Sequence, residues 1–153
     1  MRSTGSRTLF AGPLQRPAPV TKRRVMFLCL GNVCRSQMAE GFARAYGMDV
    51  MEPVSAGLAP GTMVDPVTIR LMAERGIDIS GQFPKEIRIA AHKGLDLALN
   101  MSGYPAPGMS VSVRDWPVRD PHMLPEKIHR EVRDEIERLV MALVLELRGP
   151  RQV

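Results

Sequence analysis

The sequence predicts an α/β fold in a single domain, with a small four-stranded parallel sheet and helices on both faces. Apolar segments alternate with helical segments along the chain, and this alternation is typical of a parallel sheet joined by crossover helices. The first apolar segment, 25–28, has no polar residue, as expected for a central strand that is covered on both faces. A length of 153 residues fits one domain with its own core.

Four short segments predict strands, at 24–30, 50–55, 95–99 and 109–113. Four further segments predict helices, at 36–46, 66–72, 87–92 and 126–147. In the first helix Met38, Phe42 and Ala45 share one face, and Gly47 follows its end.

Two of the predicted helices are supported by further sequence features. The second begins with Asp65 as N-cap and Pro66 as first helical residue. The last has apolar residues that recur every three or four positions on one face: Ile128, Val132, Ile136, Leu139, Leu143 and Leu147.

The excess positive charge lies in the first part of the chain. The formal net charge is +5, and residues 1–24 contain six Lys and Arg and no acidic residue, so the remainder is close to neutral. This distribution argues against a nucleic-acid groove in the domain. The Pro, Gly and Ser content of this first segment, together with its charge, predicts a disordered basic tail at 1–23. We expect a domain at 24–148 and a short C-terminal tail at 149–153.

No apolar run approaches the length of a membrane span, and the N-terminal segment lacks the apolar region of a signal peptide. We therefore expect a cytoplasmic protein without a membrane partner. The sequence leaves its oligomeric state open.

The chain contains two cysteines, Cys29 and Cys34, which is too few for a disulfide-rich framework. Their spacing differs from the close CxxC pairs of zinc sites, and the histidines His92, His122 and His129 are scattered. The sequence thus predicts no metal site. We interpret the histidines as surface residues or as residues whose hydrogen bonds are satisfied within the fold.

The segment 24–40 predicts a binding site for a small tetrahedral anion. An apolar strand ends at Cys29, a short loop with Gly31 and Asn32 follows, and a helix begins near Ser36. At such a junction the loop N–H groups and the positive end of the helix converge on one point. Gly31 allows close approach of the backbone, and Asn32 tolerates a left-handed turn. The predicted anion-binding residues are Leu30, Gly31, Asn32, Val33, Cys34, Arg35 and Ser36.

The spacing Cys29-x5-Arg35 places a thiol and a guanidinium around the same anion. The helix N-terminus, the loop amides and Arg35 all favour the thiolate of Cys29, which is therefore the predicted nucleophile. Arg35 offers a planar fork of donors for two oxygens of a phosphate-like group and for the charge that develops during its transfer. Ser36 could hydrogen-bond to the Cys29 sulfur, cap the helix, or do both.

The residues CLGNVCRS at 29–36, followed by MAE at 38–40, resemble the low-molecular-weight protein tyrosine phosphatases and the related thiol-dependent arsenate reductases. The resemblance extends over about residues 24–148 and includes SAGL at 55–58, VDPVTIRLM at 64–72, ISGQ at 79–82 and DWPVRDP at 115–121. It implies a small parallel sheet enclosed by helices, with the catalytic phosphate-binding loop after the first strand.

The resemblance also implies roles that spacing alone leaves open. The similar enzymes keep their general acid in an Asp-Pro pair of a late loop, so Asp120, before Pro121, is the implied acid. Asp115 in the same loop is the alternative. Family members with a second cysteine like Cys34 can form a disulfide with the nucleophile; otherwise Cys34 is a small buried hydrophobe.

This chain departs from the similar enzymes at several positions. Phosphotyrosine-specific members have tyrosines where it has His122 and Met123, and an aromatic residue where it has Leu58. Thioredoxin-coupled arsenate reductases have a further redox cysteine where it has Met101. Gln37 stands where a proline commonly starts the helix.

The main functional prediction is a cysteine-dependent phosphatase that hydrolyses phosphomonoesters of the phosphotyrosine-protein type through a cysteinyl-phosphate. Cys29 would attack phosphorus, Arg35 hold the oxygens and Asp120 protonate the leaving oxygen, without a metal or organic cofactor. The expected partner is a phosphorylated protein or a small phosphomonoester.

One alternative is an arsenate reductase in which a neighbouring or external thiol assists Cys29, with arsenate as partner. The other is a non-catalytic oxyanion-binding module.

Overall fold

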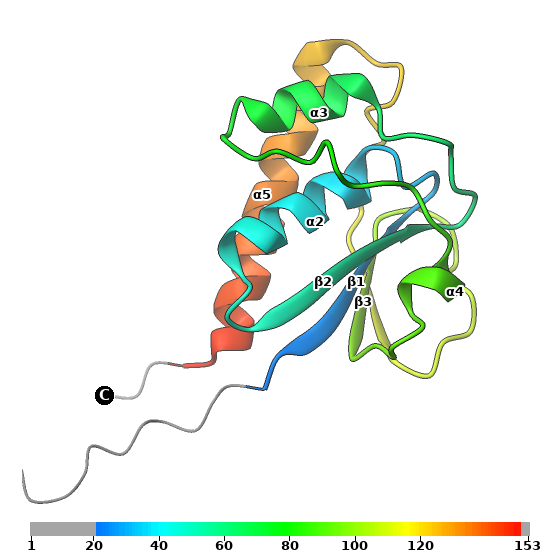
Figure 1. Ribbon diagram of the computed structural model, residues 1–153, viewed down its shortest axis with the longest axis vertical. Helices are drawn as coiled ribbons and strands as arrows, with labels where there is room; N and C mark the ends of the chain where they lie inside the picture. The colour runs from blue at the N-terminus through cyan, green and yellow to red at the C-terminus, as the bar shows by residue number, and fades with distance from the viewer. Residues whose placement is uncertain (1–20, 151–153) are drawn as a thin grey trace, which may run out of the picture.

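The computed structural model describes residues 21–150, which form a four-stranded parallel sheet with flanking helices (Figure 1). The strands lie in the order β2-β1-β3-β4, with bounds β1 Arg23–Cys29, β2 Met51–Gly57, β3 Leu97–Asn100 and β4 Ser112–Asp115. β1 is central: it pairs with β2 along its whole length and with β3 from Val25 to Leu28. The predicted α/β fold is confirmed.

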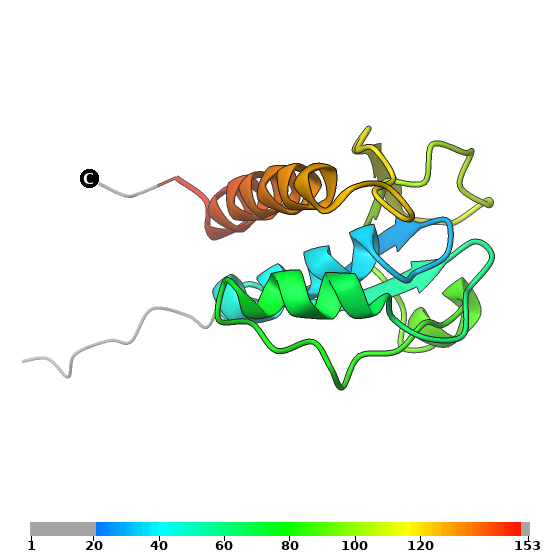
Figure 2. The same cartoon turned by 90° about the horizontal axis from the view of Figure 1, so that it is seen from above.

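Helices cover both faces of this sheet (Figures 1 and 2). They are α2 Arg35–Tyr46, α3 Pro66–Ala73, α4 Ile87–Ala90 and α5 Glu126–Arg148. α2 and α5 pack on one face, where Phe27, Phe42 and Ile136 belong to the larger core. The short α4 covers the other face, where Met26 and Ala90 belong to a smaller core. Successive residues of β1 thus point into different cores, as side chains of a strand must.

β4 differs from the sequence prediction, which placed a strand at 109–113. The strand begins at Ser112, which pairs with Leu97, because Met109 and Val111 pack against the smaller core instead. Apolar Met109 and Val111 alternate with serines in the sequence. This alternation reflects an irregular segment that packs on the core and is not a strand. All four residues of β4 are exposed, as at the edge of a sheet. The other predicted strands and helices differ from the observed ones by one or two residues.

Residues 1–20 and 151–153 lie outside the described residues, and so does most of the predicted tails at 1–23 and 149–153. Arg23 already belongs to β1, where its N–H group donates to the carbonyl of Val50 at 3.0 Å. Between residues 21 and 150, no helix is both long enough and apolar enough to cross a membrane.

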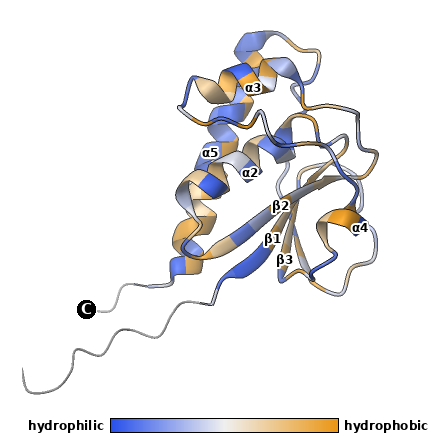
Figure 3. Cartoon of the chain, viewed as in Figure 1, coloured by the Kyte–Doolittle hydropathy of each residue, from blue (hydrophilic) through white to orange (hydrophobic). Residues whose placement is uncertain are grey.

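α5 packs against α2 along much of its length. Figure 3 shows apolar and polar residues alternating along this helix. Its apolar face is buried against the core, with Ile136 and Val140 fully enclosed. Ile128, Leu139 and Leu147, which the sequence pattern placed on the same face, are partly buried at its margin.

We expect Ile136→Ala to lower the free energy of unfolding by about 2–5 kcal/mol, because it removes buried methyl groups and leaves a cavity in the larger core. Urea unfolding followed by circular dichroism measures this change. Leu145→Ala, on the exposed side of the same helix, is the matched control and should stay within about 0.5 kcal/mol of the wild type. Equal losses in the two variants would contradict the observed orientation of α5.

Candidate active site

The predicted anion-binding residues lie at the C-terminal end of the central strand, in the segment that joins β1 to α2. We call residues 29–36 the β1–α2 loop. The sheet order places β2 on one side of β1 and β3 on the other, and ligands of open parallel sheets usually bind at such a point. The N-terminus of α2 lies directly at this loop, since the helix begins at Arg35.

Main-chain hydrogen bonds turn the carbonyl groups of the β1–α2 loop outward. Four of its carbonyl oxygens accept bonds of 2.8–3.0 Å from N–H groups of residues 58–65: Cys29 from Leu58, Leu30 from Ala59, Gly31 from Gly61 and Val33 from Asp65. Because the two polar groups of a peptide unit point in opposite directions, the loop N–H groups face its interior. The N–H group of Asn32 lies 3.3 Å from the Cys29 sulfur, and Asn32 adopts a left-handed conformation, with φ of 54°.

Gly57, the last residue of β2, allows this close contact between the loop and the neighbouring segment. A Cβ atom at this position would lie 2.9 Å from backbone atoms of Leu30, Gly31 and Asn32. Backbone atoms cannot move aside without moving the loop itself, so only glycine fits here.

The sulfur of Cys29 is surrounded by hydrogen-bonding groups. Its Sγ lies 2.9 Å from Oγ of Ser36, which in turn accepts a 2.7 Å hydrogen bond from Nδ2 of Asn32. The Ser36 hydroxyl can therefore direct its own hydrogen toward the sulfur. Ser36 lies inside α2 rather than at its N-cap position, so of its two expected roles the contact with sulfur is the one observed.

Arg35 is buried and connects the loop with two later segments. Its Nη1 atom donates to the carbonyl groups of Met101 and Val118, the latter at 3.1 Å. Its Nη2 atom lies 3.4 Å from Oδ2 of Asp120, whose side chain is about half exposed. The predicted nucleophile loop, its arginine and the implied general acid thus lie together.

Asp115, the alternative acid, lies elsewhere. It ends β4 and lines a separate recess with Asn100 and Tyr104. No hydrogen bond or ion pair joins its carboxylate to the described part of the β1–α2 loop. The geometry therefore favours Asp120 as the acid of this site.

Polar groups to which sequence patterns assigned no role in the site hydrogen-bond to the loop and to one another. The N–H group of Lys85 donates to Oδ1 of Asn32 at 3.0 Å, and Nε2 of Gln37 donates to the Asn32 carbonyl at 2.9 Å. The Lys85 ammonium lies 3.7 Å from the buried carboxylate of Glu40, which also accepts a 2.6 Å hydrogen bond from Ser55. Burial lowers the pKa of Lys85, and the charge of Glu40 opposes this effect.

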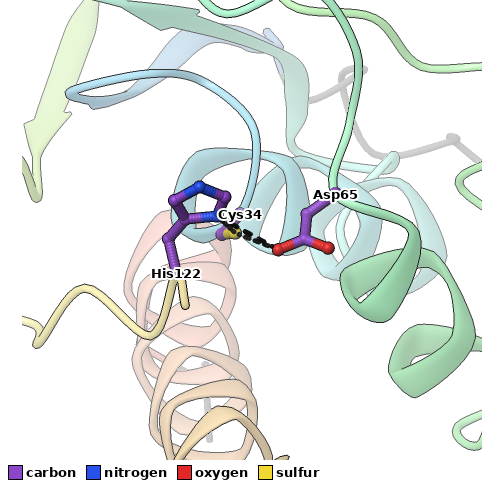
Figure 4. Close-up of side chains that lie close together, drawn as sticks. All are labelled: Cys34, Asp65 and His122. Carbon is purple, nitrogen blue, oxygen red and sulfur yellow. Dashed lines mark hydrogen bonds and ion pairs between the residues drawn. The ribbon is translucent and has the colours of Figure 1, made fainter. Parts of the chain in front are cut away.

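The second cysteine has a different environment. Cys34 is buried, and its Sγ donates to Oδ2 of Asp65 at 3.5 Å and lies 4.0 Å from Nδ1 of His122 (Figure 4). Burial, together with the negative charge of Asp65, raises the pKa of Cys34 far above its usual value, although a hydrogen bond with Thr68 acts in the opposite direction. The thiol of Cys34 is therefore protonated at neutral pH.

The two histidines near the site have different surroundings. His129 is buried with Nε2 2.8 Å from Oγ1 of Thr68, so its hydrogen bonding is satisfied, and burial lowers its pKa. His122 is about half exposed, with Nδ1 3.2 Å from Oδ2 of Asp65. Burial raises the pKa of Asp65, but hydrogen bonds from Val67, His122 and Cys34 outweigh it and leave that pKa lowered.

Comparison with known proteins gives these observations a context. A family model described as low molecular weight phosphotyrosine protein phosphatase matches residues 24–107. A glutaredoxin arsenate reductase from Synechocystis sp. is 34% identical over 130 residues, which cover 82% of this chain and 98% of that relative. Further relatives that are 35 to 40% identical are named arsenate reductase.

Two solved structures are also similar. An arsenate reductase in the phosphate-binding state has a TM-score of 0.74 and 33% identity, over 82% of this chain and 98% of that one. A low-molecular-weight protein tyrosine phosphatase from T. tengcongensis has a TM-score of 0.64 and 30% identity, over 82% of this chain and 99% of that one. These comparisons confirm the resemblance.

The same findings correct the functional prediction. The prediction of a phosphatase acting on phosphomonoesters of the phosphotyrosine-protein type is wrong, because the relatives of 34 to 40% identity are named arsenate reductases. Similar solved structures carry the same name. The reductase alternative, in which a thiol assists Cys29, agrees better with them.

We expect Gly57→Ala to displace the β1–α2 loop, because the added methyl group meets backbone atoms on three loop residues. It should weaken binding of inorganic phosphate, measured by calorimetry, and lower the free energy of unfolding by about 1–3 kcal/mol. Gly81→Ala is the matched control, since nothing lies within 4 Å of a Cβ atom there. Wild-type phosphate affinity in Gly57→Ala would contradict the argument.

Proposed function

The chain belongs to the low-molecular-weight phosphotyrosine protein phosphatase family, and from that premise we propose that it reduces arsenate to arsenite with Cys29 as nucleophile. The observation that carries the proposal is the environment of the Cys29 sulfur. Ser36 and Asn32 both hydrogen-bond to it, inside a loop whose N–H groups face the same point. The names of the relatives favour arsenate over an organic phosphate as the bound oxyanion.

In the first step the Cys29 thiolate attacks arsenic(V), so that a sulfur–arsenic bond forms and one arsenic–oxygen bond breaks. The loop N–H groups and Arg35 hold the remaining oxygens and stabilise their charge. The departing oxygen leaves as water after protonation. We assign one of its protons to Asp120, whose Oδ2 lies 3.4 Å from Arg35.

In the second step an external small thiol attacks the sulfur of Cys29. A disulfide forms between the two sulfurs, the sulfur–arsenic bond breaks, and its electron pair reduces arsenic(V) to arsenic(III), which leaves as arsenite. A second thiol molecule then reduces the mixed disulfide and restores Cys29. The two electrons therefore come from two external thiols.

The environment of Cys34 supports an external rather than an internal thiol. A thiol attacks as its thiolate, but burial raises the pKa of Cys34 and its Sγ donates to Asp65. The chain has only two cysteines, with Met101 at the position where thioredoxin-coupled relatives are expected to carry another. The name of one relative includes glutaredoxin, which agrees with a thiol donor from outside the chain.

The surroundings of the loop favour a small inorganic anion. Leu58 packs against the smaller core, and the ring of His122 faces Asp65 and Cys34. Neither position therefore offers an aromatic wall for a tyrosine ring.

Cys29→Ser should lower arsenite formation by more than about a thousandfold, because a serine hydroxyl is not ionised at neutral pH. The assay supplies arsenate and glutathione and detects arsenite. Omission of the thiol should stop wild-type turnover, and hydrolysis of an aryl phosphate should be negligible in parallel. Rapid aryl phosphate hydrolysis without thiol-dependent arsenite formation would show that the proposal is wrong.

Cys34→Ser should reduce thiol-dependent turnover by less than about tenfold, because the thiol that resolves Cys29 comes from solution. Mass spectrometry during turnover should find the mixed disulfide on Cys29. If Cys34→Ser is as inactive as Cys29→Ser, and a Cys29–Cys34 disulfide accumulates in the wild type, the resolving thiol is internal.

A further inference from the structure

Three side chains with metal-binding atoms converge beside the β1–α2 loop. Cys34 comes from the loop, Asp65 from the residue before α3 and His122 from the segment before α5, and Figure 4 shows them pointing toward one another. We propose that they form a binding site for a thiophilic divalent metal ion such as zinc. This proposal does not depend on the reaction assigned to Cys29.

The distances between the three donor atoms fit tetrahedral coordination. Bond lengths of about 2.0–2.3 Å to zinc give separations between ligand atoms of roughly 3.3–3.6 Å in a tetrahedron. The observed separations are 3.5 Å from Cys34 Sγ to Asp65 Oδ2, 3.2 Å from His122 Nδ1 to Asp65 Oδ2, and 4.0 Å from Cys34 Sγ to His122 Nδ1. A shift of a few tenths of an ångström in the His122 ring brings the third distance into that range.

The ligand atoms are oriented by groups that a metal would not displace. Oδ1 of Asp65 accepts a 2.9 Å hydrogen bond from the N–H group of Val67 as the N-cap of α3, which directs Oδ2 toward Cys34 and His122. The N–H group of His122 donates to Oδ1 of Asp120 at 3.0 Å, which fixes the backbone that carries the imidazole. Such supporting contacts hold metal ligands in place and tune affinity.

The donor set and its exposure also suit a soft metal ion. A thiolate, an imidazole and a carboxylate are all zinc ligands, and the sulfur selects against magnesium and calcium. Cys34 is buried, whereas the side chain of His122 is about half exposed, so an ion can enter from the His122 side. When the ion binds, the Cys34 thiol releases its proton to solvent and a metal–sulfur bond forms.

The sequence expectation of no metal site rested on spacing along the chain. The ligands are 31 and 57 residues apart, because they come from three different connections at the same end of the sheet. Metal binding would join the segment that carries Asp120 to the β1–α2 loop, since His122 follows Asp120 by two residues.

Titration of the reduced full-length protein with Co²⁺ and Zn²⁺ tests the proposal. Co²⁺ should give a thiolate charge-transfer band that saturates at one equivalent, and Zn²⁺ should displace it. The band should persist in Cys29→Ser, whose remaining thiol is Cys34. Affinity, from competition with a chromophoric chelator, should fall by more than about tenfold in His122→Ala and in Asp65→Asn.

The variants are chosen to remove ligand atoms while the fold is preserved. Asparagine is also a good N-cap, so Asp65→Asn preserves the start of α3 while it removes the anionic ligand. His92→Ala, at an exposed histidine elsewhere, is the matched control and should bind the metal like the wild type. Loss of the band in Cys29→Ser, wild-type affinity in both ligand variants, or failure of the wild type to bind either metal would overturn the proposal.

Discussion

The site depends on the main-chain hydrogen bonds between the β1–α2 loop and residues 58–65. These bonds orient the loop carbonyl groups away from the Cys29 sulfur. If the carbonyl oxygens pointed inward, their partial negative charge would repel an anion. The register of the sheet sets up this contact, since Cys29 and Gly57 are partners at the ends of β1 and β2. The absence of a side chain at Gly57 then allows the two backbones to meet. The pairing of two strands thus sets the surroundings of the Cys29 sulfur.

A second layer of polar groups keeps the loop in this shape. Lys85 and Glu40 form an ion pair behind Asn32, and Ser55 adds a hydrogen bond to the same carboxylate. Burying two charges is unfavourable by itself, so such a pair is weak evidence for stability. The ion pair instead helps to hold Lys85 in place. The backbone N–H group of Lys85 in turn donates to the side chain of Asn32. The left-handed residue of the loop is therefore fixed on both its carbonyl and its side chain.

Local patterns were enough to predict most of the fold and the loop that holds the candidate site. The apolar run before Cys29 predicted the central strand, and Asp65-Pro66 predicted the start of α3, where Asp65 does cap the helix. The segment 109–113 was misassigned because side chains that alternate in polarity also suit an irregular segment packed on a core. The partners of His122 and Lys85 could not be predicted, since they lie far away in the chain and no short motif joins them. The choice of the phosphatase over the reductase was wrong because the loop motif resembles both groups of enzymes and does not distinguish between them.

The exposed strand β4 has a consequence for association between molecules. An edge strand can pair with the edge of another chain, and long apolar edges promote aggregation through such pairing. β4 has only four residues, and Arg114 within it forms two hydrogen bonds of 2.8 and 2.6 Å with the carboxylate of Glu146 on α5. A neighbouring molecule that added a strand here would have to accommodate this charged pair and the carboxylate of Asp115. The short length and the charges of β4 thus make this edge a poor template for a further strand.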